Sequence, residues 1–202
     1  MPPRAEYIIG VDLGQGAQYS GLCVLERTEK LTHDDEKPVR RYGCRLLKRW
    51  PLGTAYPAML ANIAGLVKNP ILRDWTLVLG ATNVGRPVVE SFHQAKLPVK
   101  LQPVFITTGQ DATFAHRVHH VAKVILISSV QLPLQERRLQ FAQSLQETPM
   151  LMKELQNYRT KTTQPTTDVI DIREGQNDDL VLALGLGCWW GERPKREIVW
   201  WA

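Results

Sequence analysis

Cysteines are few in this chain of 202 residues, and long apolar runs and nucleotide-binding motifs are absent from it. The three cysteines lie far apart without the spacing of a metal cluster, so we expect reduced core residues. No apolar stretch approaches the ~20 residues that span a bilayer, and the amino-terminal residues lack the apolar core of a signal peptide. No Gly-x-x-x-x-Gly-Lys-Ser/Thr phosphate loop occurs either. These absences predict a cytoplasmic protein without a membrane span that is not by itself a P-loop ATPase.

No internal repeat, low-complexity segment or long linker divides the chain. Hydrophobic residues make up 44% and charged residues 22%, which is typical of a globular domain. We therefore expect a single domain over residues 1–202, with its core at about residues 7–190 and a tail over residues 191–202. The tail is rich in tryptophan and basic residues that could stack on bases, although docking onto the domain's own core is favoured.

Apolar patterning predicts the order of strands and helices. Strands are expected over residues 7–11, 19–25, 40–50, 75–79 and 99–106, with another short strand over 169–172. Helices are expected over residues 54–73, 87–95, 124–145 with a break near Pro133, 149–158 and 178–190. Residues 107–120 are expected to form a loop, and residues 160–167 a loop or an edge hairpin. A strand meander followed by alternating helices and strands predicts a mixed α/β sheet covered by helices.

The first informative stretch is residues 7–26, Tyr-Ile-Ile-Gly-Val-Asp-Leu-Gly-Gln-Gly-Ala-Gln-Tyr-Ser-Gly-Leu-Cys-Val-Leu-Glu. A β-branched, apolar strand runs directly into Asp12, and Gly14 and Gly16 then supply a tight turn. A carboxylate at the end of a buried strand is costly unless something compensates it, and a metal ion is one such compensation. The alternative is that Asp12 only caps the turn.

The second informative stretch is residues 173–190, Arg-Glu-Gly-Gln-Asn-Asp-Asp-Leu-Val-Leu-Ala-Leu-Gly-Leu-Gly-Cys-Trp-Trp. Asp178 and Asp179 open a helix that is apolar nearly all round, which is typical of a buried helix. Capping explains one acid, whereas the second points toward the face that packs on the sheet. If this helix crosses the sheet, Asp179 could approach Asp12. Two or three converging carboxylates bind Mg²⁺ or Mn²⁺, and such ions support phosphodiester cleavage.

Positive charge is clustered in two stretches, although a net charge of +5 is not diagnostic of a polyanionic partner. The members are Lys37, Arg40, Arg41, Arg45, Lys48 and Arg49 in the first cluster, and His116, Arg117, His119, His120 and Lys123 in the second. Each cluster is interpreted either as a nucleic-acid contact or as a solvated face. The three histidines have a spacing that could bind a metal, but nothing else in the sequence supports this, so a basic loop is favoured.

Three stretches together resemble the ribonuclease H-like nuclease domain of phage terminase large subunits. They are Ile-Gly-Val-Asp-Leu-Gly in the first strand, Ala-Thr-Asn-Val-Gly-Arg-Pro-Val-Val at residues 81–89, and Arg-Glu-Gly-Gln-Asn-Asp-Asp-Leu at residues 173–180. The resemblance covers residues 7–190. It implies an α/β, ribonuclease H-like fold with a mixed five-stranded sheet flanked by helices. Actin-like ATPases and sugar kinases open with a similar strand, but the actin-like architecture needs two such domains.

The resemblance also implies a metal site that holds Mg²⁺ or Mn²⁺. Asp12 matches the first metal-binding acid of the family, and Asp179 matches the last, with Asp178 as the other possibility. The chain departs from the family at Gly80, where an acid usually precedes the middle motif, and at Asn177, where histidine is frequent. Glu90 does not obviously replace the missing acid, because it lies past the first turn of the following helix. Glu174 is another candidate.

The function implied is metal-dependent DNA cleavage without the ATPase half of a terminase, weakened by Gly80. Asp12, Asp179 and Asp178 would be catalytic and would bind the metal. The partners implied are DNA and phage packaging proteins. We expect the residues that contact DNA to be Arg40, Arg41, Arg45, Arg86, Arg117 and Lys123. The alternatives are an inactive ribonuclease H-like module that binds nucleic acid or a protein partner, and a resolvase of branched DNA.

Overall fold

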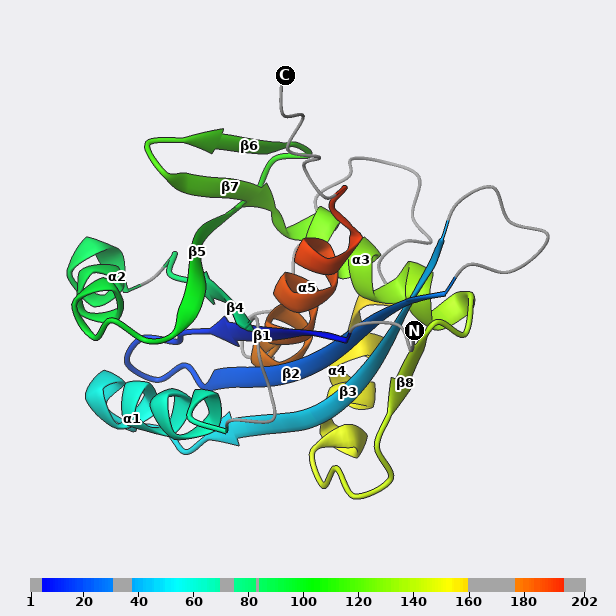
Figure 1. Ribbon diagram of the computed structural model, residues 1–202, viewed down its shortest axis with the longest axis horizontal. Coiled ribbons are helices and arrows are strands. Elements are labelled where there is room, and N and C mark those ends of the chain that lie inside the picture. The colour runs from blue at the N-terminus through cyan, green and yellow to red at the C-terminus, as the bar shows by residue number, and fades with distance from the viewer. Residues whose placement is uncertain (1–4, 31–37, 70–74, 83, 160–176, 195–202) are drawn as a thin grey trace, which may run out of the picture.

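The computed structural model describes residues 5–30, 38–69, 75–82, 84–159 and 177–194. Eight strands form one sheet in the order β6-β7-β5-β4-β1-β2-β3-β8 (Figure 1). The strands are β1 (Glu6–Asp12), β2 (Ser20–Lys30), β3 (Val39–Trp50), β4 (Trp75–Gly80), β5 (Val99–Thr107), β6 (Ala112–Ala115), β7 (Val118–Ala122) and β8 (Leu139–Phe141). Antiparallel pairs join β1 to β2, β2 to β3 and β6 to β7, and the other pairs are parallel. The predicted mixed sheet is therefore confirmed.

Helices cover both faces of the sheet. They are α1 (Tyr56–Val67), α2 (Gly85–Gln94), α3 (Lys123–Gln135), α4 (Thr148–Arg159) and α5 (Asp179–Glu192). The helices α3, α4 and α5 share one apolar core with the sheet, while α1 and α2 form a second core with the opposite face (Figure 1). Alternation along β1 separates the two cores, because Ile8 faces the first and Ile9 the second. No helix among the described residues is long and apolar enough to cross a membrane.

Among the described residues the sheet has eight strands, whereas the resemblance implies five. The segment expected as a loop over residues 107–120 contains the β6–β7 hairpin, whose turn places His116 and Arg117 at positive φ. All four residues of β6 are exposed, so this edge strand has no apolar alternation that would reveal it in the sequence. The third unexpected strand, β8, is only three residues long and pairs with β3. The strand expected over 169–172 and the loop over 160–167 lie outside the described residues.

Two glycines allow α5 to lie directly against the sheet. A Cβ atom on Gly10 would meet the backbone oxygen of Ala183 at 2.1 Å, and one on Gly21 would meet that of Asp179 at 2.3 Å. Only residues without a side chain fit at these two points, since backbone cannot yield as a flexible side chain can. The first turn of α5 is thus held against β2 at Gly21, which is the direct partner of Asp12 on β1.

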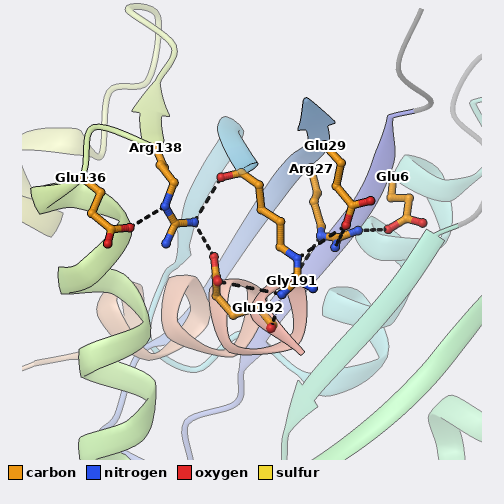
Figure 2. Close-up of polar contacts among 8 residues, drawn as sticks. Glu6, Arg27, Glu29, Glu136, Arg138, Gly191 and Glu192 are labelled. Atoms are coloured by element: carbon orange, nitrogen blue, oxygen red, sulfur yellow. Dashed lines mark hydrogen bonds and ion pairs between the residues drawn. The ribbon is translucent and has the colours of Figure 1, made fainter. Parts of the chain in front are cut away.

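An arginine network anchors the other end of α5 (Figure 2). Arg27 on β2 is only 3% exposed; its Nε donates to the carbonyl oxygen of Gly191, and its other nitrogens pair with Glu6, at 2.5 Å, and with Glu29. Arg40 on the neighbouring strand β3 contacts Glu192, and so does Arg138 in the segment after α3. Arginine side chains thus satisfy carbonyl groups that the end of a helix leaves without intrahelical partners.

The cysteines and one pair of tryptophans lie in or against the core of the domain. The three cysteines are buried and free, as predicted. Trp189 and Trp190 lie in α5, and Trp189 belongs to the core, where it is 8% exposed. The second tryptophan pair, at residues 200 and 201, lies outside the described residues.

Candidate functional site

A cavity of about 250 Å³ opens at one end of the sheet, where the carboxyl ends of β1, β4 and β5 meet the first turns of α3 and α5. Its acidic wall contains Asp12, Asp178 and Asp179, which the sequence proposed as one site. The remaining lining residues are Gly14, Gln18, Tyr19, Thr82, Ile106, Thr107, Thr108, Lys123, Asn177 and Leu182. The fold therefore brings together acids from chain positions more than 160 residues apart.

Asp12 is the last residue of β1, and the residues paired with it on β2 and β4 determine which side chains lie next to its carboxylate. Gly80 pairs with it on one side and Gly21 on the other, and Gly21 in turn pairs with Arg49 on β3. Residues paired directly across a ladder project to the same face. The row therefore places two glycines next to the Asp12 carboxylate and an arginine one strand further away. A Cβ on Gly80 would lie 2.9 Å from Asp12 Oδ1.

Asp178 occupies the cap position of α5, yet its carboxylate makes no capping hydrogen bond. Instead Tyr158 Oη donates to Asp178 Oδ2 at 2.6 Å, and Lys123 Nζ pairs with the same oxygen at 2.5 Å. The side chain is 20% exposed. The side chain of Asp178 therefore does not cap the helix. Its contacts come from α3 and α4, and it borders the cavity.

Asp179 is more deeply buried than Asp178 and is bonded to Arg49 of β3. Arg49 donates from Nε to Asp179 Oδ2 and from Nη2 to Asp179 Oδ1, each at 2.8 Å. The same Nη2 contacts Glu154 on α4, whose second carboxylate oxygen accepts a hydrogen bond from the backbone of Val181 at 3.1 Å. Asp179 and Glu154 are 4% and 3% exposed. Both oxygens of Asp179 are therefore already bonded within the protein.

Burial raises the pKa values of Asp12, Glu154 and Asp179. Burial raises the pKa of Asp12 well above its usual value, and the nearby charges of Asp178 and Asp179 raise it further. Burial followed by the charge of Asp179 raises the pKa of Glu154 to about 8. The pKa of Asp179 is raised by burial, which the hydrogen bonds from Arg49 oppose. Carboxyl groups whose pKa rises in a cleft for these reasons are candidates for a functional site.

The carboxylates available for a metal ion are few. Among the described residues there is no group of three or more histidine, cysteine, aspartate or glutamate side chains placed to hold one ion. Asp12 and Asp178 remain as ligand candidates, because Arg49 occupies Asp179. Glu90 is exposed on α2, away from the acidic wall, and Glu174 lies outside the described residues.

Most of the predicted DNA-contacting residues lie away from this cavity. Arg40 and Arg41 lie near the start of β3, about 26 to 30 Å before Arg49 at ~3.3 Å per residue. Arg117 lies in the β6–β7 turn on the opposite edge of the sheet. Arg40 contacts Glu29 and Glu192, and Arg45 pairs with Glu26 at 2.6 Å. Arg86 and Lys123, by contrast, lie near the cavity end of the sheet. The six residues predicted to contact DNA therefore do not form one continuous surface.

The three histidines do not converge. His119 is 5% exposed and packs against Trp189 and Trp190, with its Nε2 3.2 Å from Gln102 Oε1. His120, the next residue along the strand, stacks at a tilt on Phe105. Neighbouring residues of a strand face opposite sides of the sheet, so these two imidazoles cannot share an ion. His119 is a core histidine rather than part of a basic loop.

Sequence reasoning missed the roles of Arg49 and Glu154. Arg49 was counted in a basic cluster, and only the strand register shows that it lies in the same row as Asp12. Glu154 carries a readable signal: Leu151, Glu154, Leu155 and Tyr158 follow the spacing of one helix face, and an acid interrupts its apolar stripe. A buried carboxylate on such a stripe predicts a cationic partner, although the sequence does not identify it.

The fold is similar to that of the large terminase nuclease from the thermophilic phage G20c. The crystal structure of that nuclease with bound magnesium matches with a TM-score of 0.57 and 21% sequence identity, covering 92% of this chain and 82% of the other. A second crystal structure of the same nuclease matches with a TM-score of 0.56 and 20% identity, covering 91% and 81%. No family model and no curated protein match the sequence. The likeness confirms the expected ribonuclease H-like fold of terminase nucleases.

Proposed function

We propose that this chain is a metal-dependent DNA endonuclease of the terminase nuclease type that works with one divalent ion. The observation that carries the proposal is the convergence of Asp12 and Asp178 in one open cavity, on a fold shared with a nuclease whose crystal structure was determined with bound magnesium. Both acids come from the ends of elements that pack rigidly against each other, which is how an ion site is kept in position.

The charges of the site fit one divalent cation. Four carboxyl groups, those of Asp12, Asp178, Asp179 and Glu154, face two cationic side chains, Arg49 and Lys123. When all four are ionised, two negative charges remain uncompensated. Burial raises the pKa values of Asp12 and Glu154, and the charges of the neighbouring carboxylates raise them further. Oxygen ligands of this kind are the ones that Mg²⁺ and Mn²⁺ prefer.

Each acid then has its own part. Asp12 and Asp178 would hold the ion, and Asp179, bonded at both oxygens to Arg49, would fix the start of α5 against β3. Gly80 offers no carboxylate for a second ion. When bound, a divalent ion would lower the pKa of a coordinated water and polarise the phosphate. Because two carboxylates hold an ion loosely, we expect slow cleavage that is better supported by Mn²⁺ than by Mg²⁺.

DNA would approach the cavity end of the sheet. Arg86 is exposed in the first turn of α2, directly after the strand that ends at Gly80, and Lys123 borders the cavity. Arg40, Arg41, Arg45 and Arg117 would contact only DNA that extends around the edges of the sheet. Such contacts to the phosphate backbone weaken steeply with added salt, because binding releases counterions.

A second candidate function is binding without cleavage, to DNA or to a packaging protein. It is favoured by Gly80 and by Lys123, whose ammonium group already compensates Asp178. In this case Asp12 and Asp178 would have no ligand role.

A cleavage assay separates these candidates. Supercoiled, linear and four-way-junction DNA would be incubated with Mn²⁺ or Mg²⁺ and with wild-type protein, Asp12→Asn or Asp178→Asn. We expect slow nicking by the wild type, faster with Mn²⁺, and none by either variant. Preference for the junction would indicate a resolvase. No cleavage of any DNA, together with salt-dependent binding, would reject the nuclease and favour the binding module.

A further inference from the structure

Lys123 is the basic side chain of the cavity. It is the first residue of α3, directly after β7, and it is the one lysine or arginine among the lining residues that the structure describes. Its Nζ lies 2.5 Å from Asp178 Oδ2, and its side chain is 27% exposed. The charge of Lys123 also lowers the pKa of Asp12, which burial raises. The ammonium group therefore contacts Asp178, acts on Asp12 through its charge, and remains open to the cavity.

The other nearby cation, Arg49, is not available to a ligand in the same way. Its Nε and Nη2 are bonded to Asp179 and Glu154, its side chain is only 11% exposed, and it does not line the cavity. A lysine ammonium has three N–H donors, and Asp178 is the partner that Lys123 has among the described residues. Donors are thus left over on Lys123 for an anion inside the cavity.

Phosphodiester cleavage needs more positive charge than one ion supplies. Two-ion enzymes stabilise both the attacking and the leaving oxygen with metal. Here the carboxylates suffice for one ion, since Gly80 has no side chain and Asp179 is held by Arg49. We propose that Lys123 replaces the second ion by contacting a non-bridging oxygen of the bound DNA phosphate. This inference rests on the proposed function and assigns the residue that would touch the phosphate.

A simpler role would be that Lys123 only neutralises Asp178. The two roles differ once Asp178 is made neutral. If Lys123 only compensates Asp178, its removal from an Asp178→Asn background has no further effect on DNA binding. If it contacts phosphate, its removal weakens binding in either background. A double-mutant cycle therefore separates the two roles.

The first experiment measures binding of a single-stranded oligonucleotide in EDTA, by fluorescence anisotropy over a salt series. Lys123→Met should weaken binding about tenfold in both backgrounds, and the slope of log K against log salt should become less steep by about 0.7, the value for one phosphate contact. Lys123→Arg should retain binding. The control is Lys100→Met, because Lys100 is exposed near the start of β5, at the end of the sheet opposite the cavity. Unchanged binding of Lys123→Met/Asp178→Asn relative to Asp178→Asn would overturn the inference.

The second experiment separates this inference from the proposed function. Mn²⁺ affinity, followed by electron paramagnetic resonance, should be equal or higher in Lys123→Met, because a competing cation is gone, while single-turnover cleavage should fall at least about 100-fold. If wild-type protein cuts no DNA but the oligonucleotide data hold, the nuclease proposal fails and the phosphate contact stands. If the wild type cuts and Lys123→Met cuts equally fast, the nuclease stands and the inference is wrong.

Discussion

Arg49 donates hydrogen bonds to both carboxylate oxygens of Asp179. In the neighbouring Asp178, the described side chains of Tyr158 and Lys123 contact only Oδ2. Two adjacent aspartates at the start of one helix thus have different surroundings. Both acids line the cavity, but the deeper one, Asp179, has both oxygens bonded to Arg49 in an internal ion network. We infer that Asp178, rather than Asp179, is the partner of Asp12 in holding an ion.

Removing Arg49 should destabilise the fold strongly. Arg49→Met leaves the buried carboxyl groups of Asp179 and Glu154 without their cation, a change that costs about 3–5 kcal/mol for buried pairs. Urea denaturation of wild type and variant measures this loss. The matched control is Arg45→Met on the same strand, where an exposed pair with Glu26 is worth at most about 1 kcal/mol. Equal effects of both substitutions would contradict the assignment of Arg49 to a buried network.

Glu154 should make stability fall as pH rises. Its pKa is about 8 in the folded protein and 4.5 as a model value, so between these pH values the folded state binds the proton more tightly and unfolding releases it. The free energy of unfolding then decreases with pH, by at most about 1.4 kcal/mol per pH unit from this group. Glu154→Gln keeps the shape without the titration. We expect urea unfolding at pH 5 to 8 to show a flatter pH dependence in the variant, and identical slopes would refute the raised pKa.

The central strands of the sheet could be predicted because each has a recognisable local sequence pattern. The five central strands and the buried helix α5 each have an apolar run or a clear period, and Gly14 and Gly16 mark the turn between β1 and β2. The edge elements could not be predicted in this way. The β6 strand is exposed along its whole length, and β8 has three residues, so neither has a pattern that distinguishes it from a loop.

The acidic wall was predictable in part. A carboxylate at the end of a buried strand and a pair at the start of a buried helix are unusual enough to be noticed, and they do line one cavity. The sequence alone does not show which residues of neighbouring strands are paired. The row of Gly80, Asp12, Gly21 and Arg49 depends on the register between four strands. The separation of Arg41 from the cavity likewise depends on β3 running toward it from the far end of the sheet.

Arg86 should matter more for DNA binding than Arg41. Both side chains are exposed, but Arg86 lies at the cavity end of the sheet and Arg41 at the start of β3. We expect Arg86→Glu to weaken binding of a short duplex at low salt at least about tenfold, through one lost phosphate contact and one new repulsion. Arg41→Glu serves as the control of equal charge change. A larger loss from Arg41→Glu would place the DNA on the far part of the sheet.

Arg27 should affect stability without affecting the site. Arg27→Met removes the hydrogen bonds that Arg27 donates to the Gly191 carbonyl and to the carboxylates of Glu6 and Glu29 (Figure 2), so we expect a loss of about 3 kcal/mol in urea denaturation. This network lies at the carboxyl end of α5, about 20 Å along the helix from the acids at its start. Mn²⁺ affinity of the folded variant should equal that of the wild type. A weaker affinity would mean that the anchoring of α5 also sets the geometry of the site.

Gly80 offers the sharpest test of the weakened metal site. A side chain there begins 2.9 Å from Asp12 Oδ1 and 2.9 Å from Leu186 Cδ1, which are ends of side chains, and 3.2 Å from the backbone oxygen of Val11. Gly80→Asp therefore adds a carboxylate directly beside Asp12. Without metal this like charge should make the variant less stable than Gly80→Asn, which has the same shape and no charge. With Mn²⁺ the order should reverse, because a third carboxylate strengthens ion binding.

Thermal unfolding with and without Mn²⁺ compares Gly80→Asp, Gly80→Asn and Gly80→Ala. The last variant reports the steric cost of a Cβ alone, so the effect of charge is the difference between the first two. Single-turnover cleavage should rise in Gly80→Asp only. If Gly80→Asp gains no stability from Mn²⁺ relative to Gly80→Asn, the ion does not bind between β1 and β4. If the wild type already cuts DNA rapidly and Gly80→Asp slows it, another acid completes the site. Glu174, the other acid that the sequence offers for this role, would then be the first to test, through Glu174→Gln.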